Sequence, residues 1–235
     1  MRLLLISNST NPGESYLAHA KNQLKDFLGE RKQNVIFIPY AAVTFSFDEY
    51  EKKVNDVFDE IGHHITGIHR FANPKEAIEN ADTIVVGGGN TWHLVKMLQD
   101  NKLMEAIRKK VKEGALYIGW SAGANIACPT LKTTNDMPIV EPAKFKTLNL
   151  VPFQINPHYT DEHPTNFSGE TREVRINEFI TVNRNIFVVG LREGNMLRRE
   201  ENNLTLIGNR NARIFKYGET PREWSQEDDI SFLLS

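Results

Sequence analysis

Cysteine pairs, long apolar runs and an excess of charge of either sign are all missing from this chain of 235 residues. The single cysteine, Cys128, rules out an intramolecular disulfide and fits a reducing compartment. The apolar run at residues 3–6 is too short for a signal-peptide core, and no segment approaches the roughly 20 apolar residues that span a bilayer. A formal net charge of −2 gives no electrostatic basis for binding nucleic acid or an anionic membrane. We therefore expect a cytoplasmic protein.

Short apolar runs alternate with helix-like segments along most of the chain. The runs are continuous rather than alternating, as is typical of strands covered on both faces, and they occupy residues 3–6, 35–38, 83–86, 116–118 and 186–189. The segments with helical spacing occupy residues 14–28, 47–61, 75–79, 91–98 and 103–112. This order predicts an α/β fold with a mostly parallel central sheet and helices on both faces.

The C-terminal part has a different pattern. Short strand-like runs at residues 195–200, 204–208 and 213–217 are separated by Asn-Asn and Gly-Asn turn signals, which predict an antiparallel extension of the sheet. Residues 129–149 lack a clear period, and we expect them to cross the surface near an active site. No internal repeat or break in composition divides residues 1–235, so we expect a single domain.

The sequence Gly119-Trp120-Ser121-Ala122-Gly123 places a G-x-S-x-G motif directly after a predicted buried strand. A nucleophilic serine at such a position needs a sharp turn, with small residues on both sides so that strand and helix can approach closely. The amide of Ala122 then points at the reacting carbonyl from the start of a helix. The alternative is a strand-to-helix turn whose glycines serve packing alone.

A second motif, Gly87-Gly88-Gly89-Asn90-Thr91, also lies between a predicted strand and a predicted helix. Successive glycines let bare backbone amides approach a ligand closely. The motif has neither the lysine of a P-loop nor the spacing of a dinucleotide fingerprint. In a parallel sheet both motifs lie at the carboxyl ends of the strands, where ligands bind. The glycine amides can therefore form an oxyanion hole with Ala122, although a tight turn capped by Asn90 is the simpler reading.

A serine hydroxyl needs a base, and only His158 and His163 follow both motifs. His158 follows a short apolar run and a proline that stiffens the turn, so we prefer it. His93 lies close to the glycine motif, and we expect it to face a neighbouring helix. The other histidines precede both motifs and are expected to be solvated: His19, His63, His64 and His69.

Two carboxylates compete for the role of orienting the base. Asp136 gives the order Ser…Asp…His of α/β-hydrolases. Glu193 gives the order Ser…His…Glu and follows a run that we expect to be a central strand. Because a strand end is rigid and triads are recognised by geometry rather than by order, we prefer Glu193, but the residues alone leave both open.

Taken together, these motifs resemble those of the peptidase E family, the aspartyl dipeptidases that include cyanophycinase-like relatives. The resemblance covers nearly the whole chain and rests on Gly87-Gly88-Gly89-Asn90-Thr91, Gly119-Trp120-Ser121-Ala122-Gly123-Ala124, Asn156-Pro157-His158-Tyr159 and Glu193-Gly194. It implies a fold similar to class I glutamine amidotransferases, which carry cysteine where this chain has Ser121. It also implies hydrolysis of dipeptides with an N-terminal aspartate, without a metal. We expect no other cofactor and a small peptide substrate, and the sequence does not decide between a monomer and a homodimer.

Transferred residue by residue, the resemblance places the catalytic triad on Ser121, His158 and Glu193. It places the oxyanion-hole amides on Gly88, Gly89 and Ala122.

An aspartyl substrate needs a cation for its side chain and an acceptor for its ammonium group. Arginine binds carboxylates through a planar fork, and Arg172 and Arg175 follow the proposed base at the start of a helix-like segment. We prefer Arg172 for the side chain and Asp136 for the ammonium group, and we count Asn90 among the substrate-binding residues. Both arginines are equally consistent with a solvated helix surface.

Two other functions stay open at this point. One is a serine hydrolase that acts on β-aspartyl, cyanophycin-type or ester substrates. The other is a non-enzymatic module that binds an anion at the glycine motif. If the chain is a hydrolase of either specificity, residues 161–169 are suited by position to form a lid over the site.

Overall fold

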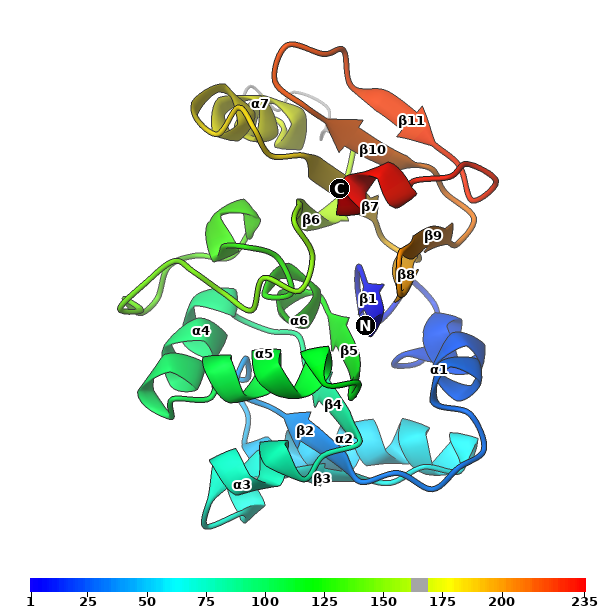
Figure 1. Cartoon of the computed structure of the whole chain (residues 1–235), viewed down its shortest axis with the longest axis vertical. Helices are drawn as coiled ribbons and strands as arrows, with labels where there is room; N and C mark the ends of the chain where they lie inside the picture. Colours follow the sequence, from blue (N-terminus) through cyan, green and yellow to red (C-terminus); the bar gives the residue numbers. More distant parts are fainter. Residues whose placement is uncertain (162–168) are drawn as a thin grey trace.

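A computed structural model describes residues 1–161 and 169–235. His163 and most of the predicted lid lie outside the described residues. Within them, the main body is a seven-stranded sheet in the order β3-β2-β4-β5-β1-β8-β9 (Figure 1). Its strands are β1 (Arg2–Ile6), β2 (Val35–Ile38), β3 (Ile65–Gly67), β4 (Thr83–Val86), β5 (Leu116–Trp120), β8 (Met196–Glu200) and β9 (Asn203–Ile207). The first five are mutually parallel, as predicted.

Helices cover both faces of this sheet, as the continuous apolar strands predict. The described helices of this layer are α1 (Lys21–Leu28), α2 (Phe47–Phe58), α3 (Pro74–Glu79), α4 (Thr91–Asp100), α5 (Met104–Lys112) and α6 (Ala122–Asn125). Neighbouring strand residues point to opposite sides, so Leu3 and Leu5 pack on the side of α3 to α6, whereas Leu4 and Ile6 pack on the side of α1 and α2. The sheet is therefore packed on both faces by separate hydrophobic cores, which hold the ends of its strands in place.

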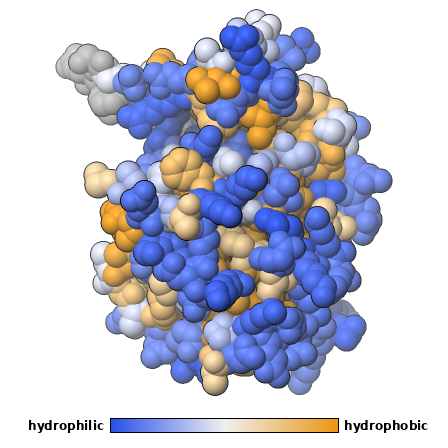
Figure 2. Space-filling view, turned by 60° about the vertical axis from the view of Figure 1, so that its left-hand side comes forward, coloured by the Kyte–Doolittle hydropathy of each residue, from blue (hydrophilic) through white to orange (hydrophobic). Residues whose placement is uncertain are grey.

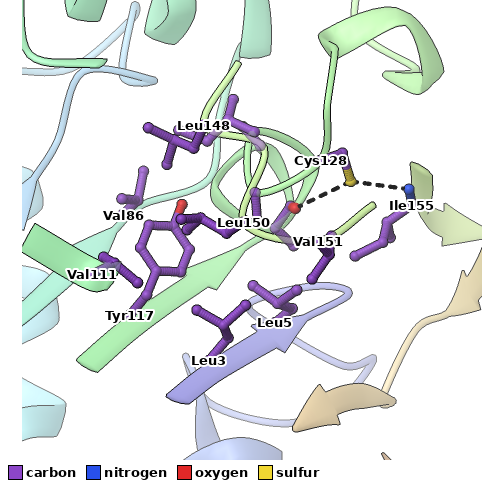
Figure 3. Packing of buried hydrophobic residues seen from close by; sticks show 14 of the residues in the cluster. Leu3, Leu5, Val86, Val111, Tyr117, Cys128, Leu148, Leu150, Val151 and Ile155 are labelled. Atoms are coloured by element: carbon purple, nitrogen blue, oxygen red, sulfur yellow. Dashed lines mark hydrogen bonds between the residues drawn. The ribbon is translucent and has the colours of Figure 1, made fainter. Parts of the chain in front are cut away.

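The core around β5 shows how closely the sheet and the following chain fit together (Figure 3). Tyr117 is fully buried beside Leu3 and Leu5, and its hydroxyl donates to the carbonyl of Gly123 at 2.7 Å. Leu148 is also fully buried in this core. The prediction that residues 129–149 cross the surface was therefore wrong at their C-terminal end, since isolated leucines in an aperiodic segment carry no signal of burial.

A second, four-stranded sheet lies beyond the β8–β9 side of the first, at the top of Figure 1, in the order β11-β10-β7-β6. It consists of β6 (Gln154–Tyr159), β7 (Val188–Arg192), β10 (Ala212–Phe215) and β11 (Arg222–Trp224), and α7 (Arg172–Val182) packs on it. The run at residues 186–189 was predicted as a central strand. The strand that begins in it, β7, is central, since β6 and β10 pair with it on either side, but it belongs to the second sheet and not to the main one. Val188 packs against α7, whereas Val189 packs against the main core. The apolar run therefore predicts a strand that is buried on both faces, but it does not predict which sheet the strand joins.

The predicted antiparallel extension is confirmed for the β8–β9 hairpin, which pairs with β1. It is wrong for residues 213–217, since β10 pairs with β7 in the second sheet. Turn signals fix a hairpin between neighbouring strands, but they do not determine the partner of the next strand along the chain.

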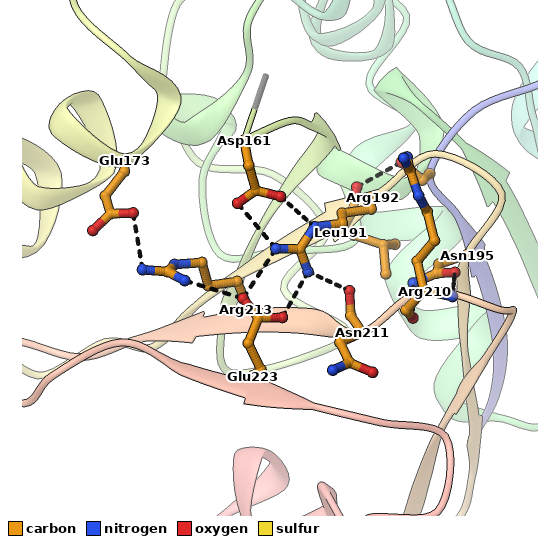
Figure 4. Close-up of polar contacts among 10 residues, drawn as sticks. Asp161, Glu173, Leu191, Arg192, Asn195, Arg210, Asn211, Arg213 and Glu223 are labelled. Atoms are coloured by element: carbon orange, nitrogen blue, oxygen red, sulfur yellow. Dashed lines mark hydrogen bonds and ion pairs between the residues drawn. The ribbon is translucent and has the colours of Figure 1, made fainter. Parts of the chain in front are cut away.

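An arginine at the end of β7 ties the second sheet together (Figure 4). The Arg192 guanidinium donates to both carboxylate oxygens of Asp161 and of Glu223 and to the carbonyl of Asn211. Only 12% of its side chain is exposed, and these bonds raise its pKa further above its already high value. Because charge-assisted bidentate pairs are the strongest hydrogen bonds of this kind, they fix the residue immediately before Glu193.

The described residues contain no helix with both the length and the apolar character needed to cross a membrane. On the face shown in Figure 2, hydrophobic residues occur as small groups among hydrophilic ones.

Candidate active site

The turn after β5 holds Ser121 in a strained conformation. Its φ is 53° and its ψ is −112°, in a region that a residue with a side chain rarely adopts. A Cβ at Gly119 would meet the backbone of Gly123, and a Cβ at Gly123 would overlap the carbonyl of Val86. The two glycines are therefore required for the close approach of strand and helix, and the turn lifts the Ser121 hydroxyl above the edge of the sheet.

His158 reaches this hydroxyl from the second sheet. Its Nε2 lies 2.8 Å from the Ser121 Oγ, at a bulge of β6 where φ of His158 is 54°. The His158 amide donates to the Oγ of the buried Ser7 at 2.9 Å, and that hydroxyl donates to the carbonyl of Leu191 at 2.7 Å. The bulge thus re-aims the imidazole, and Ser7 anchors it to both sheets.

Glu193, directly after β7, contacts the other ring nitrogen. Its Oε1 lies 2.6 Å from the Nδ1 of His158. The chain turns immediately afterwards at Gly194, whose φ is 85° and whose amide donates to the side-chain oxygen of Asn8 at 2.8 Å. With Nδ1 donating to Glu193, Nε2 is left to accept the proton of the Ser121 hydroxyl.

In the described part of the chain, Asp136 forms no hydrogen bond with His158 and instead contacts Thr91 and Thr134. Its Oδ2 accepts from the Thr91 amide at 2.7 Å, the Thr91 hydroxyl at 2.6 Å and the Thr134 hydroxyl at 3.0 Å. The amide belongs to the first residue of α4, where the helix dipole favours an anion. The Asp136 side chain is therefore held at a helix start, and the structure brings Glu193 rather than Asp136 to the imidazole.

Asp136 and Ser121 line a common pocket with a cavity volume of about 360 Å³. The side chains that matter for its chemistry are Thr91, Ser121, Asn135, Asp136, His158 and Arg172. Of these, the threonine and the asparagine were not singled out in the sequence. The only signal for them is their position, since one ends the glycine motif and the other precedes Asp136.

Arg172, the first residue of α7, provides positive charge in this pocket. One of its terminal nitrogens donates to the Asn135 side chain at 2.5 Å. Burial lowers the pKa of Arg172 and the nearby Arg175 lowers it further, but an arginine stays protonated at any physiological pH. Arg175 instead lies 3.7 Å from Glu170 and is more than half exposed. The geometry therefore singles out Arg172 of the two candidates.

The glycine turn lies against Ser121. A Cβ at Gly88 would come within 3.0 Å of the Cβ of Ser121. Among the described residues, the amides of Gly88 and Gly89 donate to no other protein group, and the amide of Ala122 is the first of α6, which leaves it free of an intrahelical acceptor. These N–H groups, from the glycine turn that contacts Ser121 and from the residue after Ser121, are thus without an acceptor among the described residues.

We counted Asn90 among the substrate-binding residues, but its side chain forms the helix cap that was the simpler reading of this motif. Its Oδ1 accepts from the His93 amide at 3.0 Å and its Nδ2 donates to the carbonyl of Met137 at 2.9 Å. The side chain thus caps α4 and ties it to the segment that carries Asp136. Both polar ends of Asn90 are used within the protein.

Most of the remaining histidines are less exposed than predicted. His64 is exposed, whereas His63 is buried and its Nε2 donates to the Gly29 carbonyl. The rings of His19 and His69 are also largely enclosed, with 7% and 17% of their side chains exposed. His93 contacts the carbonyl of Tyr40 at 2.6 Å instead of a neighbouring helix. Single histidines carry no periodic signal, so the sequence does not reveal their burial.

Cys128 is remote from this chemistry. It is fully buried, its thiol lies 3.9 Å from the Ala124 carbonyl, and the Ile155 amide donates to its sulfur at 3.1 Å (Figure 3). Burial raises the pKa of the thiol well above its usual range, so the reactive thiolate does not form at neutral pH.

We therefore predict that iodoacetamide leaves hydrolytic activity unchanged and does not alkylate the native chain. Residual activity and intact mass after treatment at neutral pH measure this, with urea-unfolded protein as the control that does alkylate. Loss of activity in step with carbamidomethylation of Cys128 would contradict the position of this thiol.

Comparison with known proteins assigns nearly the whole chain to one family. A model of peptidase family S51 matches residues 3–207. A protein named Peptidase E from a Nostoc species is 52% identical over 233 residues, which cover 99% of this chain and 96% of the relative. A protein of the same name from Salmonella paratyphi A is 49% identical over 219 residues, covering 93% of this chain and 95% of the relative.

Solved structures agree on the fold. The crystal structure of a peptidase from an acI-B1 Actinobacterium matches with a TM-score of 0.69 at 16% identity, covering 98% of this chain and 96% of the other. A crystal structure from Listeria monocytogenes matches with a TM-score of 0.59 at 22% identity, covering 95% and 98%. The architecture of two sheets is thus shared by chains of very different sequence.

Proposed function

The chain belongs to peptidase family S51 and is a serine peptidase, and from that premise we propose that it hydrolyses dipeptides with an N-terminal aspartate. The observation that carries the proposal is the continuous contact from Glu193 through His158 to Ser121 at the edge of a pocket. The same pocket contains one fixed carboxylate, Asp136, and one arginine, Arg172.

The charges of the pocket are complementary to an aspartyl residue with a free amino group. The Arg172 guanidinium pairs with the substrate's side-chain carboxylate, for which its planar fork is suited. Asp136 binds the substrate ammonium group through Oδ1, to which no other group in the described part of the chain donates. A pocket with one cation and one anion discriminates against neutral and N-blocked peptides because their binding leaves one of these charges desolvated and unpaired.

The reaction in this proposal is acyl transfer through Ser121. His158 accepts the hydroxyl proton as the Ser121 oxygen attacks the scissile carbonyl, and Glu193 stabilises the imidazolium that results. The amides of Gly89 and Ala122 hold the negative oxygen of the tetrahedral intermediate. His158 then gives its proton to the leaving amine, and a water molecule activated by the same imidazole releases aspartate from Ser121.

A panel of four peptides tests the substrate. We expect Asp-Leu to be cleaved with a kcat/KM at least about 100-fold above that of Asn-Leu, since a site built for a charged partner rejects a substrate that leaves it unpaired. N-acetyl-Asp-Leu should be a similarly poor substrate. Release of leucine, measured by a coupled amino-acid assay, gives all the rates.

The fourth peptide, β-Asp-Leu, separates this proposal from the β-aspartyl and cyanophycin-type alternative. In that peptide the ammonium group lies one bond farther from the scissile carbonyl, so it does not reach Asp136 when the carbonyl faces Ser121. Faster cleavage of β-Asp-Leu, or equal cleavage of the acetylated peptide, would contradict the proposal.

A further inference from the structure

A buried tyrosine forms a hydrogen bond with the backbone of the glycine turn. Tyr50, in the first turn of α2, is 4% exposed, and its hydroxyl lies 2.9 Å from the carbonyl oxygen of Gly88. The rings of Phe37 and Phe45 contact it edge-on, with centroids at 5.0 and 5.2 Å. These two aromatic contacts hold the Tyr50 ring, and with it the hydroxyl, in place.

The direction of its hydrogen bonds follows from what each partner is able to do. A carbonyl oxygen only accepts, so Tyr50 donates its single proton to Gly88. The indole N–H of Trp120 only donates, and it reaches the Tyr50 oxygen at 3.1 Å. The Tyr16 hydroxyl donates to the same oxygen at 3.3 Å. Burial raises the pKa of Tyr50 above its ordinary value, so its hydroxyl keeps its proton at neutral pH.

A bond to the Gly88 carbonyl fixes the next amide as well. The peptide unit is planar and trans, so its C=O and N–H point in opposite directions, and the Gly89 N–H points away from Tyr50. The following peptide is fixed too, because the Asn90 amide donates to the Ala41 carbonyl at 2.9 Å. Gly89 itself has a φ of 135°, and a Cβ there would overlap that carbonyl. Both peptides around Gly89 are thus held in place. Of their two N–H groups, that of Asn90 is used, whereas that of Gly89 has no acceptor in the part of the chain that the structure describes.

We infer that Tyr50 is a positioning residue that holds the Gly88–Gly89 peptide with its N–H directed at the oxyanion formed on Ser121. Without this hydroxyl the peptide is free to rotate, and a flipped peptide presents a carbonyl oxygen where the negative charge develops. Tyr50 touches neither the substrate nor the reacting atoms, and its connection to the nucleophile also runs through Trp120, the residue before Ser121. The inference rests on the proposed function of Ser121.

The first experiment uses the wild-type chain. It is treated with a fluorophosphonate, and the crystal structure of the Ser121 adduct is determined. We expect the phosphonyl oxygen to accept from the amides of Gly89 and Ala122 while the Gly88 carbonyl stays on the Tyr50 hydroxyl. An adduct whose oxygen is not bonded to the Gly89 amide would overturn the inference. If Ser121 does not react at all, the proposed function itself fails, which is a different and recognisable result.

The second experiment compares two hydroxyl deletions. Tyr50→Phe is expected to lower kcat for Asp-Leu by about 10- to 100-fold, less than the 100- to 1000-fold typical of removing a donor outright, with KM within about twofold of the wild-type value. Tyr16→Phe is the matched control, since it removes a hydroxyl from the same group without touching Gly88, and its kcat should stay within about twofold.

A folded Tyr50→Phe variant with unchanged kcat would overturn the inference, and so would an equal loss in both variants. If the Tyr50 variant does not fold, the wild-type adduct decides.

Discussion

Ser121→Ala is expected to lower kcat/KM for Asp-Leu by about 10⁴- to 10⁶-fold, the range in which removing a serine nucleophile falls. The variant loses one contact, to the imidazole of His158, and Ser121 is only half-buried. The melting temperature should therefore stay close to that of the wild-type chain. Leucine release and thermal unfolding, measured on the same preparations, separate lost chemistry from lost structure.

Combining this change with His158→Ala provides an internal control. Because nucleophile and base act in the same step, the double variant should be hardly slower than either single one. Losses that multiply would show that Ser121 and His158 contribute to separate steps. A Ser121→Ala variant that keeps a tenth or more of the wild-type rate would exclude this residue as the nucleophile.

Glu193→Gln is expected to lower kcat by about 10⁴-fold, as replacing the orienting carboxylate by its amide does in a comparable triad. The amide keeps the shape of the side chain but does not stabilise the imidazolium, and its NH₂ group favours the wrong tautomer of His158. The Oε1 contact at 2.6 Å is the only link of this kind to the imidazole in the described part of the chain.

Asp136→Asn is the matched comparison, since it also replaces a carboxylate by an amide within the same pocket. With Asp-Leu it should raise KM, because Asp136 binds the ammonium group in our proposal. With p-nitrophenyl acetate, which has no ammonium group, Asp136→Asn should react at the wild-type rate while Glu193→Gln stays slow. The opposite pattern would exchange the roles of the two carboxylates.

The features that the sequence predicts well are those that depend on the local chain. The glycines around Ser121 are dictated by contacts within a few residues and with the neighbouring strand, and the glycine run before Asn90 follows the same logic. Both turns were predicted at the carboxyl ends of parallel strands, and both lie there since β4 and β5 pair in register. The position of both turns in the fold therefore follows from their place directly after a predicted strand.

The features that the residues alone do not predict depend on how distant segments meet. Sequence order alone did not decide between Asp136 and Glu193, because their places follow from a bulge at His158 and from the pairing of β6 with β7 in a second sheet. The apolar run before Arg192 looks the same in either sheet, since it is covered on both faces in each. Tyr50 gave no signal either, as its role arises only from contact with Gly88.

Peptide mapping after fluorophosphonate treatment tests the central role of Ser121 most directly. We predict a single labelled site, on the peptide that contains Ser121, with labelling abolished in His158→Ala and blocked by an excess of Asp-Leu. A chain that cleaves Asp-Leu while Ser121 stays unlabelled, or that is labelled at another residue in step with inactivation, would contradict it.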